Sequence, residues 1–205
     1  MKIYVIRHGE TSANAKGLFQ GWSDIPLNDY GKQLAITTGK QMKNIHFDKV
    51  YSSPLSRSYQ TAKLLLEHNG QKNLDITIDE RIKEIHIGDW EMKKFRSDST
   101  EIPFEEAQKF FTDPIHFKGF PNGETLEDVC TRTQDFLNEL IDNSADETIL
   151  VSTHGCATRA MLNPLYENPK NFWQNQVPPN CAVNIVDVTD GIAKLTAKDK
   201  IYYTI

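Results

Sequence analysis

Hydrophobic positions follow two patterns along the chain: short continuous apolar runs, and longer stretches in which apolar residues recur at helical spacing. The short runs predict buried strands, and the spaced stretches predict amphipathic helices. The predicted strands, in chain order, are residues 3–6, 49–52, 76–78, 148–152, 182–188 and 192–196. The last two are expected to form a hairpin across Asp190-Gly191, because Asp-Gly suits a two-residue turn.

Helices are predicted between these strands, over residues 29–43, 54–66 and 124–142 and directly after Gly155. Asn28 is a suitable N-cap for the first helix and Ser53 for the second, with Pro54 in the first helical turn. This alternation of strands and helices predicts an α/β fold with a mostly parallel central sheet and helices on both faces.

One long segment lacks clear periodicity. Residues 89–120 contain scattered aromatic side chains together with Pro103 and Pro114. We interpret about 89–120 as a lid insertion over the carboxyl edge of the sheet. The total of 205 residues suits a single domain spanning 1–205.

Composition and charge exclude several classes of protein. With 39% hydrophobic and 25% charged residues the chain is expected to fold, and its net charge of −5 argues against a nucleic-acid partner. The first apolar run meets Arg7 too early for a signal peptide or a membrane span, so a cytoplasmic protein without a membrane partner is expected. Cys130, Cys156 and Cys181 form no C-x-x-C pair and are interpreted as reduced thiols.

Candidate chemistry lies where two predicted strands end. His8-Gly9 follows the first strand and His154-Gly155 follows the strand at 148–152. Ligands bind at the carboxyl edge of open α/β sheets, so both histidines could face one anion, and the glycines would let a phosphate approach the backbone. Arg57 falls in the first turns of a helix, where N–H groups also favour anions. Each residue alone has a plainer explanation, as a hydrogen-bonded strand-end histidine or a surface arginine.

The motifs around these residues stand in a fixed order: Arg7-His8-Gly9-Glu10-Thr11 with Asn14, Gln20-Gly21-Trp22-Ser23-Asp24, Ser52-Ser53-Pro54-Leu55-Ser56-Arg57, Glu84 with Gly88-Asp89-Trp90-Glu91, Asn122-Gly123-Glu124-Thr125 and Thr153-His154-Gly155. In this order they resemble the histidine phosphatase superfamily, the phosphoglycerate mutase-like group. The resemblance spans nearly the whole chain.

The resemblance implies roles for the main residues. His8 would attack phosphorus and carry the phosphoryl group, which splits one difficult displacement into two easier ones. Arg7, Arg57 and His154 would neutralise the equatorial phosphoryl oxygens. Glu84 would protonate the leaving alkoxide and later take a proton from water; without the resemblance it would be interpreted as a salt-bridge partner of a neighbouring cation. Neither a metal nor a cofactor is then required.

The resemblance also implies a set of residues that contact the substrate: Gly9, Glu10, Thr11, Asn14, Gln20, Gly21 and Gly155. A carboxylate beside a phosphate would repel it, so a supporting role is expected for Glu10. Cys156 directly follows Gly155, but without a C-x-x-x-x-x-R loop it is interpreted as a buried spectator.

The expected activity is a metal-independent phosphomonoesterase acting on a small phosphorylated metabolite. A cofactor-dependent phosphoglycerate mutase is the alternative, disfavoured because the chain is short and residues 84–91 look like the phosphatase version of that segment. A metal-dependent hydrolase using His8, Glu84, His86 and His154, or a non-catalytic phosphate-binding module, ranks lower. The sequence leaves the substrate open, and a homodimer is compatible with it.

Two features bear on the substrate. Four cations in the lid alternate with phenylalanines: Lys93, Lys94, Arg96 and Lys118. They predict either a recognition surface for a larger anion or a solvated rim above apolar packing. Glu91-Met92 also stands where Glu-Gly is common among similar proteins, and Lys16-Gly17-Leu18 stands where many have an arginine.

Overall fold

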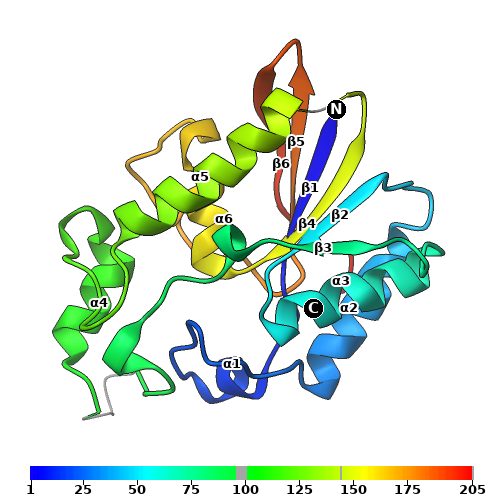
Figure 1. The fold of residues 1–205 in the computed structure, drawn as a ribbon. Coiled ribbons are helices and arrows are strands. Elements are labelled where there is room, and N and C mark those ends of the chain that lie inside the picture. The colour runs from blue at the N-terminus through cyan, green and yellow to red at the C-terminus, as the bar shows by residue number, and fades with distance from the viewer. Residues whose placement is uncertain (96–100, 144, 205) are drawn as a thin grey trace.

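The computed structural model describes residues 1–95, 101–143 and 145–204. Its centre is a mixed sheet in the order β3-β2-β4-β1-β5-β6 (Figure 1). The strands are β1 (Lys2–Arg7), β2 (Lys49–Ser52), β3 (Ile76–Ile78), β4 (Thr148–Thr153), β5 (Val183–Thr189) and β6 (Ile192–Lys200). The β3, β2, β4 and β1 strands run parallel, β5 pairs antiparallel with β1, and β6 pairs antiparallel with β5.

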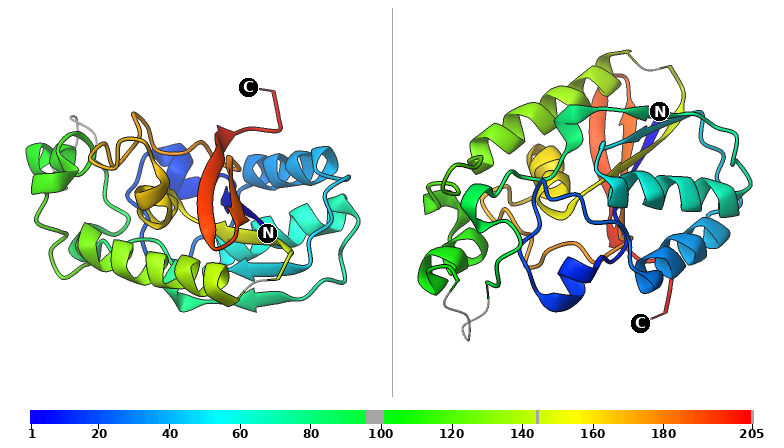
Figure 2. Two further views of the ribbon diagram at one scale, coloured as in Figure 1. Left: turned by 90° about the horizontal axis from the view of Figure 1, so that it is seen from above. Right: turned by 60° about the horizontal axis from the view of Figure 1, so that its bottom comes forward.

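Helices flank both faces of this sheet (Figures 1 and 2). The α-helices are α1 (Ser12–Lys16), α2 (Asp29–Gln41), α3 (Ser56–Asn69), α4 (Phe104–Thr112), α5 (Leu126–Asn143) and α6 (Gly155–Leu162). Short 3₁₀ turns are η1 (Glu80–Ile82), η2 (Gly88–Trp90), η3 (Pro114–His116) and η4 (Asn163–Leu165). The predicted fold class is confirmed.

The alternation of side chains along β1 divides the core between these layers. Tyr4 and Ile6 pack in one buried cluster with residues of α2 and α3. Ile3 and Val5 pack in a second cluster with residues of α5 and α6. Because successive strand residues point to opposite faces, a central strand that is apolar throughout must be covered on both sides.

Most element predictions are confirmed, with boundaries shifted by a few residues. Asn28 caps α2 as predicted, since its side chain accepts the Gly31 N–H at 2.7 Å. The predicted start of α3 is wrong: the helix begins at Ser56 after Leu55, which supplies no side-chain cap. Ser53 instead accepts the Leu55 N–H at 3.3 Å, in the turn before the helix.

The segment interpreted as a lid contains η2, α4 and η3, and α4 lies to one side of the sheet (Figure 2). Most of its aromatic side chains belong to a third apolar cluster, which joins this segment to residues after α1 and after η4. The aromatic members of the cluster are Phe19, Trp90, Phe95, Phe110, Phe111, Phe117, Phe120, Phe172 and Trp173. Arg96 lies outside the described residues. None of the described helices is both long enough and apolar enough to cross a membrane.

Candidate active site

The register of the sheet brings the two predicted histidines together. Arg7 pairs with Thr153 across the parallel β1 and β4 strands, so the residues that follow them emerge at the same edge. The rings of His8 and His154 have centroids 5.2 Å apart. Both side chains are almost fully buried.

Backbone contacts fix the tautomer of His8. Its Nδ1 lies 2.6 Å from the Gly9 carbonyl oxygen, which can only accept, so Nδ1 carries the ring proton. The Nε2 lone pair is therefore free. Burial lowers the pKa of His8 well below its usual value, and the nearby charges of Arg57 and Arg7 lower it further. The imidazole is neutral near pH 7, as a nucleophile requires.

His154 is held by Ser53. Its Nε2 lies 2.8 Å from the Ser53 hydroxyl, while its buried Nδ1 has no partner in the described parts of the chain. Burial lowers the pKa of His154 well below its usual value, with a further contribution from the charge of Arg57. Ser53 thus positions this ring, although it does not cap the helix.

Two arginines reach the histidines from different elements. Arg57 is fully buried and donates to the Gly21 and Ser23 carbonyls at 2.7 and 2.9 Å, and burial lowers its pKa to about 10. Arg7 donates to the Pro178 carbonyl. Burial lowers the pKa of Arg7, an effect opposed by the charge of Glu84.

Four buried nitrogens around His8 have no hydrogen-bond partner among the described residues: Arg7 Nε, Gln20 Nε2, Arg57 Nε and His154 Nδ1. Buried donors are nearly always paired, because an unpaired one costs about 1–3 kcal/mol. They belong to residues that the sequence selects for phosphate binding. An anion with several oxygens is the chemical group that would satisfy them.

Glu84 lies in the loop between η1 and η2 and is 8% exposed. Its Oε1 accepts the N–H groups of Ile85 and Ala157 at 2.9 and 3.0 Å, and its Oε2 accepts that of Cys156 at 3.2 Å. The first turn of α6 therefore holds the carboxyl group. Oε2 has the single contact, which leaves it free to exchange a proton with a substrate.

A side chain that the sequence did not single out supports this loop. Arg132, in α5, donates to the carbonyls of Arg81 and Lys83 at 2.7 Å and to that of Glu84 at 2.9 Å. Arg132 also forms a two-bond ion pair with Glu124, whose Oε2 accepts the His86 N–H at 2.8 Å. The backbone on both sides of Glu84 is thereby fixed to α5.

The α1 region orients Gln20. Thr11 and Asn14 form a reciprocal capping box at the start of α1. The Thr11 hydroxyl donates to Gln20 Oε1 at 2.7 Å. This contact fixes the side-chain amide of Gln20, whose Nε2 is buried. Thr11 is fully buried and contacts Gln20 without lining the cavity described below, whereas Asn14 and Gln20 both line it.

The remaining predicted residues divide between site and scaffold. A methyl group on Gly9 would meet the Gly31 carbonyl oxygen at 2.5 Å, so Gly9 permits close packing of α2. Glu10 accepts from the Asn28 amide at 2.7 Å and does not line the cavity. A methyl group on Gly155, by contrast, would lie 3.5 Å from Arg7 Nε and 3.7 Å from Glu84 Oε2.

Gly21 belongs to a loop held from two sides. Glu91 accepts the Gly21 N–H at 3.2 Å and the Trp22 N–H at 2.5 Å, opposite the two carbonyls that Arg57 binds. A methyl group on Gly21 would meet the Ile85 carbonyl oxygen at 2.5 Å. Met92, next to Glu91, has φ 60°, a left-handed conformation that favours glycine.

A cavity of about 130 Å³ opens beside these groups. Its polar lining consists of Arg7, His8, Asn14, Gln20 and Glu84. Its other lining residues are mostly apolar: Leu18, Phe19, Ile85, Ile87, Phe95, Phe110, Phe111, Gly155, Cys156, Trp173 and Val177. Lys93, Lys94 and Lys118 do not line this cavity. Cys156 does line it, and burial raises the pKa of its thiol well above the usual value.

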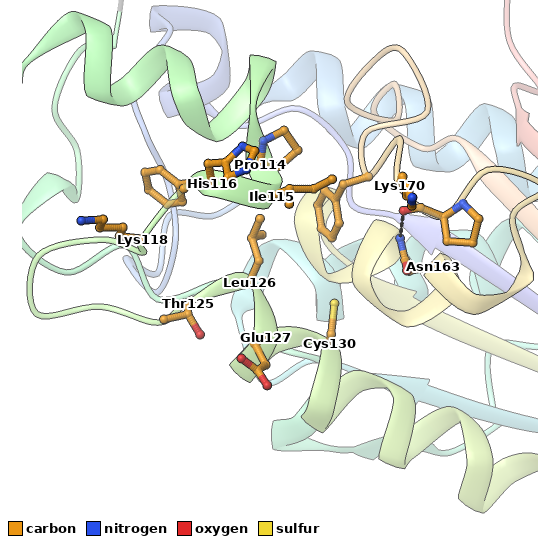
Figure 3. Close-up of a pocket in the computed structure, with 13 residues that line it drawn as sticks. Pro114, Ile115, His116, Lys118, Thr125, Leu126, Glu127, Cys130, Asn163 and Lys170 are labelled. Atoms are coloured by element: carbon orange, nitrogen blue, oxygen red, sulfur yellow. Dashed lines mark hydrogen bonds between the residues drawn. The ribbon is translucent and has the colours of Figure 1, made fainter.

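A second cavity, of about 500 Å³, lies between η3, the start of α5 and the segment after η4 (Figure 3). Lys118, His116 and Cys130 line it, and none of the predicted site residues does. In the described ranges, no three His, Cys, Asp or Glu side chains are grouped as a metal site.

Comparison with known proteins identifies the family of this chain. Residues 3–199 match the model of the histidine phosphatase superfamily, branch 1. The chain is 34% identical over 174 residues to phosphoserine phosphatase 1 of Hydrogenobacter thermophilus, covering 84% of this chain and 80% of that one. It is 32% identical over 191 residues to a 2,3-bisphosphoglycerate-dependent phosphoglycerate mutase of Staphylococcus saprophyticus, covering 80% and 84%.

The fold agrees as well. The solved structure of Bacillus stearothermophilus YhfR superposes with a TM-score of 0.88 at 27% identity, covering 98% of this chain and 97% of the other. Phosphatases and mutases thus both occur among relatives at about 30% identity.

Proposed function

Because this chain belongs to the histidine phosphatase superfamily, branch 1, we propose that it is a metal-independent phosphomonoesterase that works through a phosphohistidine on His8. The observation that carries the proposal is the set of four buried, unpaired nitrogens beside the free Nε2 of a neutral histidine. They offer hydrogen bonds to phosphoryl oxygens at the place where a nucleophile can reach phosphorus.

In the first step, His8 Nε2 forms a bond to phosphorus and the ester P–O bond breaks. The electron pair stays on the leaving oxygen, which takes a proton from Glu84 Oε2. The phosphorylated imidazole is cationic, and its Nδ1–H remains bonded to the Gly9 carbonyl, which stabilises that charge. Arg7, Arg57, Gln20 and His154 hold the transferred oxygens.

In the second step, water attacks phosphorus and gives a proton to Glu84 while the N–P bond breaks, returning a neutral His8. For His154 to donate to phosphate, its Nδ1 must carry the ring proton. The contacts of Ser53 agree with this tautomer of His154. The Ser53 hydroxyl accepts the Leu55 N–H, so its own proton is available for His154 Nε2.

Hydrolysis fits the cavity better than mutase chemistry does. A bisphosphoglycerate carries a second phosphate and a carboxylate, and each needs cationic partners when it leaves water. Among the described residues that line the cavity, Arg7 supplies the cationic side chain and already belongs to the phosphoryl site. Measuring phosphate release and phosphoglycerate isomerisation side by side tests this: isomerisation faster than release would overturn the proposal.

A further inference from the structure

The cavity beside His8 has two chemically different ends. The polar lining consists of His8 with Arg7, Asn14, Gln20 and Glu84, whereas the rest is mostly apolar and includes the rings of Phe19, Phe95, Phe110, Phe111 and Trp173, which contact one another. The first end suits the phosphoryl group. The second end would enclose the alcohol part of the substrate.

These rings form a fixed wall. Phe111 stacks on Phe19 with centroids 6.0 Å apart and planes 4° apart, and it contacts Phe95 and Trp173 at 5.6 Å. The Trp173 indole N–H donates to the Phe110 carbonyl at 2.6 Å, so its polar atom is already used. The wall therefore offers ring faces and edges to a ligand rather than hydrogen bonds.

Charge and size restrict what fits. Glu84 adds a carboxyl group to the lining of the cavity. Among the described residues of that lining, Arg7 is the cationic side chain. A second anionic group placed against the apolar part of the lining would thus lose its water without gaining a cationic partner there. The volume of about 130 Å³ has to hold the phosphoryl group together with the part of the alcohol nearest to it, so it favours a compact alcohol.

We propose that the natural substrate is the phosphate monoester of a compact, uncharged, aromatic or branched apolar alcohol. This inference rests on the proposed phosphatase function. It predicts that phosphoserine and phosphoglycerates, whose alcohols carry a carboxylate, are poor substrates for this chain.

A matched pair of esters tests the inference. Benzyl phosphate and 4-carboxybenzyl phosphate have similar leaving groups and differ by one carboxylate. We expect kcat/KM to be at least about 100-fold lower for the carboxylate ester, because several kcal/mol is the usual cost of burying an unpaired charge. Equal values for the two esters, or a preference for 3-phosphoglycerate over benzyl phosphate, would overturn the inference.

Substitution of Phe111, which is partly exposed, tests the wall itself. Phe111→Lys should raise kcat/KM for 4-carboxybenzyl phosphate and lower it for benzyl phosphate. Ile115→Lys is the control, because Ile115 is 64% exposed and does not line the cavity. If the ratio of kcat/KM for the two benzyl esters is unchanged in folded Phe111→Lys, the proposed contact between the aromatic wall and the substrate is wrong.

The outcomes separate this inference from the proposed function. If the wild-type protein hydrolyses none of these esters and also fails on p-nitrophenyl phosphate, the phosphatase proposal fails. If it hydrolyses charged and uncharged esters equally well, the phosphatase proposal stands and the substrate class is wrong.

Discussion

His8 Nδ1 lies 2.6 Å from the Gly9 carbonyl oxygen, so the peptide that follows the nucleophile also sets its tautomer. The same burial that fixes the ring lowers the pKa values of His8 and His154 well below the usual 6.5. The site therefore holds two neutral histidines in an environment that contains two guanidinium groups.

This burial predicts acid sensitivity of the fold. Below about pH 6.5 an unfolded histidine binds a proton, whereas buried His8 and His154 stay neutral until much lower pH. The unfolded state then binds more protons, so the free energy of unfolding falls as the pH falls, by about 1.4 kcal/mol per pH unit for each histidine. Denaturant titrations between pH 7 and pH 5 measure this slope.

His154→Gln should remove about half of the slope that the two histidines contribute. His46→Gln is the control, because His46 is exposed on the surface. A slope that His154→Gln leaves intact would show that His154 does not stay neutral in the folded protein.

Arg132 is predicted to be a positioning residue for Glu84. Arg132→Met removes three hydrogen bonds to the backbone at Arg81, Lys83 and Glu84. Misplacement of a catalytic group by about 1 Å can cost 100-fold, so hydrolysis of benzyl phosphate should slow by roughly tenfold to 100-fold. p-Nitrophenyl phosphate, whose leaving group scarcely needs a proton, should be affected less in its first step.

A double-mutant cycle checks that Arg132 acts through Glu84. In a Glu84→Gln background, Arg132→Met should lose most of its effect on benzyl phosphate. Arg81→Met is a matched control, since the Arg81 side chain pairs with Asp79, Asp135 and Glu139 instead of this backbone. Full additivity of the two substitutions would refute a positioning role.

Metal independence is predicted because the described side chains around the phosphoryl position are mostly nitrogen donors, with Glu84 as the carboxyl group among the described lining residues. Phosphate release should persist after dialysis against a strong chelator, and vanadate should inhibit competitively by adopting the five-coordinate geometry. Adding back Mg²⁺, Mn²⁺ or Zn²⁺ should not increase the rate. Loss of activity in chelator that one of these cations restores would contradict the arginine-based account.

Much of the fold could be predicted from the sequence because the pattern was local. The strands at 49–52 and 76–78 coincide with β2 and β3, and the hairpin across Asp190-Gly191 joins β5 to β6. The start of α3 could not be read in the same way. Ser-Pro is typical of a helix start, but the Ser53 side chain is hydrogen-bonded to His154 and the helix begins at Ser56.

The proximity of His8 and His154 could be predicted because each directly follows a strand and the two strands pair in parallel. Partners contributed by distant loops carried no such signal. Trp173 and Val177 reach the cavity from the segment after η4, and Asn180 donates to the His8 carbonyl at 3.0 Å. Arg132 falls on a helix whose periodicity indicates only an amphipathic surface, so its backbone contacts emerge from the tertiary structure.

The roles of His8 and Glu84 are predicted to separate by leaving group. His8→Ala should abolish turnover, because it removes the group that is proposed to carry the phosphoryl. Glu84→Gln keeps the nucleophile and removes the proton donor, so phosphorylation by alkyl esters should slow by about 10² to 10⁴-fold. Phosphorylation by p-nitrophenyl phosphate should slow much less. Equal slowing of the first step for every ester would contradict the acid role of Glu84.

The most direct test of the central claim is rapid-quench trapping of a phosphoenzyme from radiolabelled p-nitrophenyl phosphate, quenched in alkali, where phosphohistidine survives. Wild type and Glu84→Gln should yield an acid-labile label that peptide mapping assigns to His8, with more label in Glu84→Gln because water attack is slowed. His8→Ala should yield none. Label on another residue, or label that persists in folded His8→Ala, would contradict the phosphohistidine mechanism.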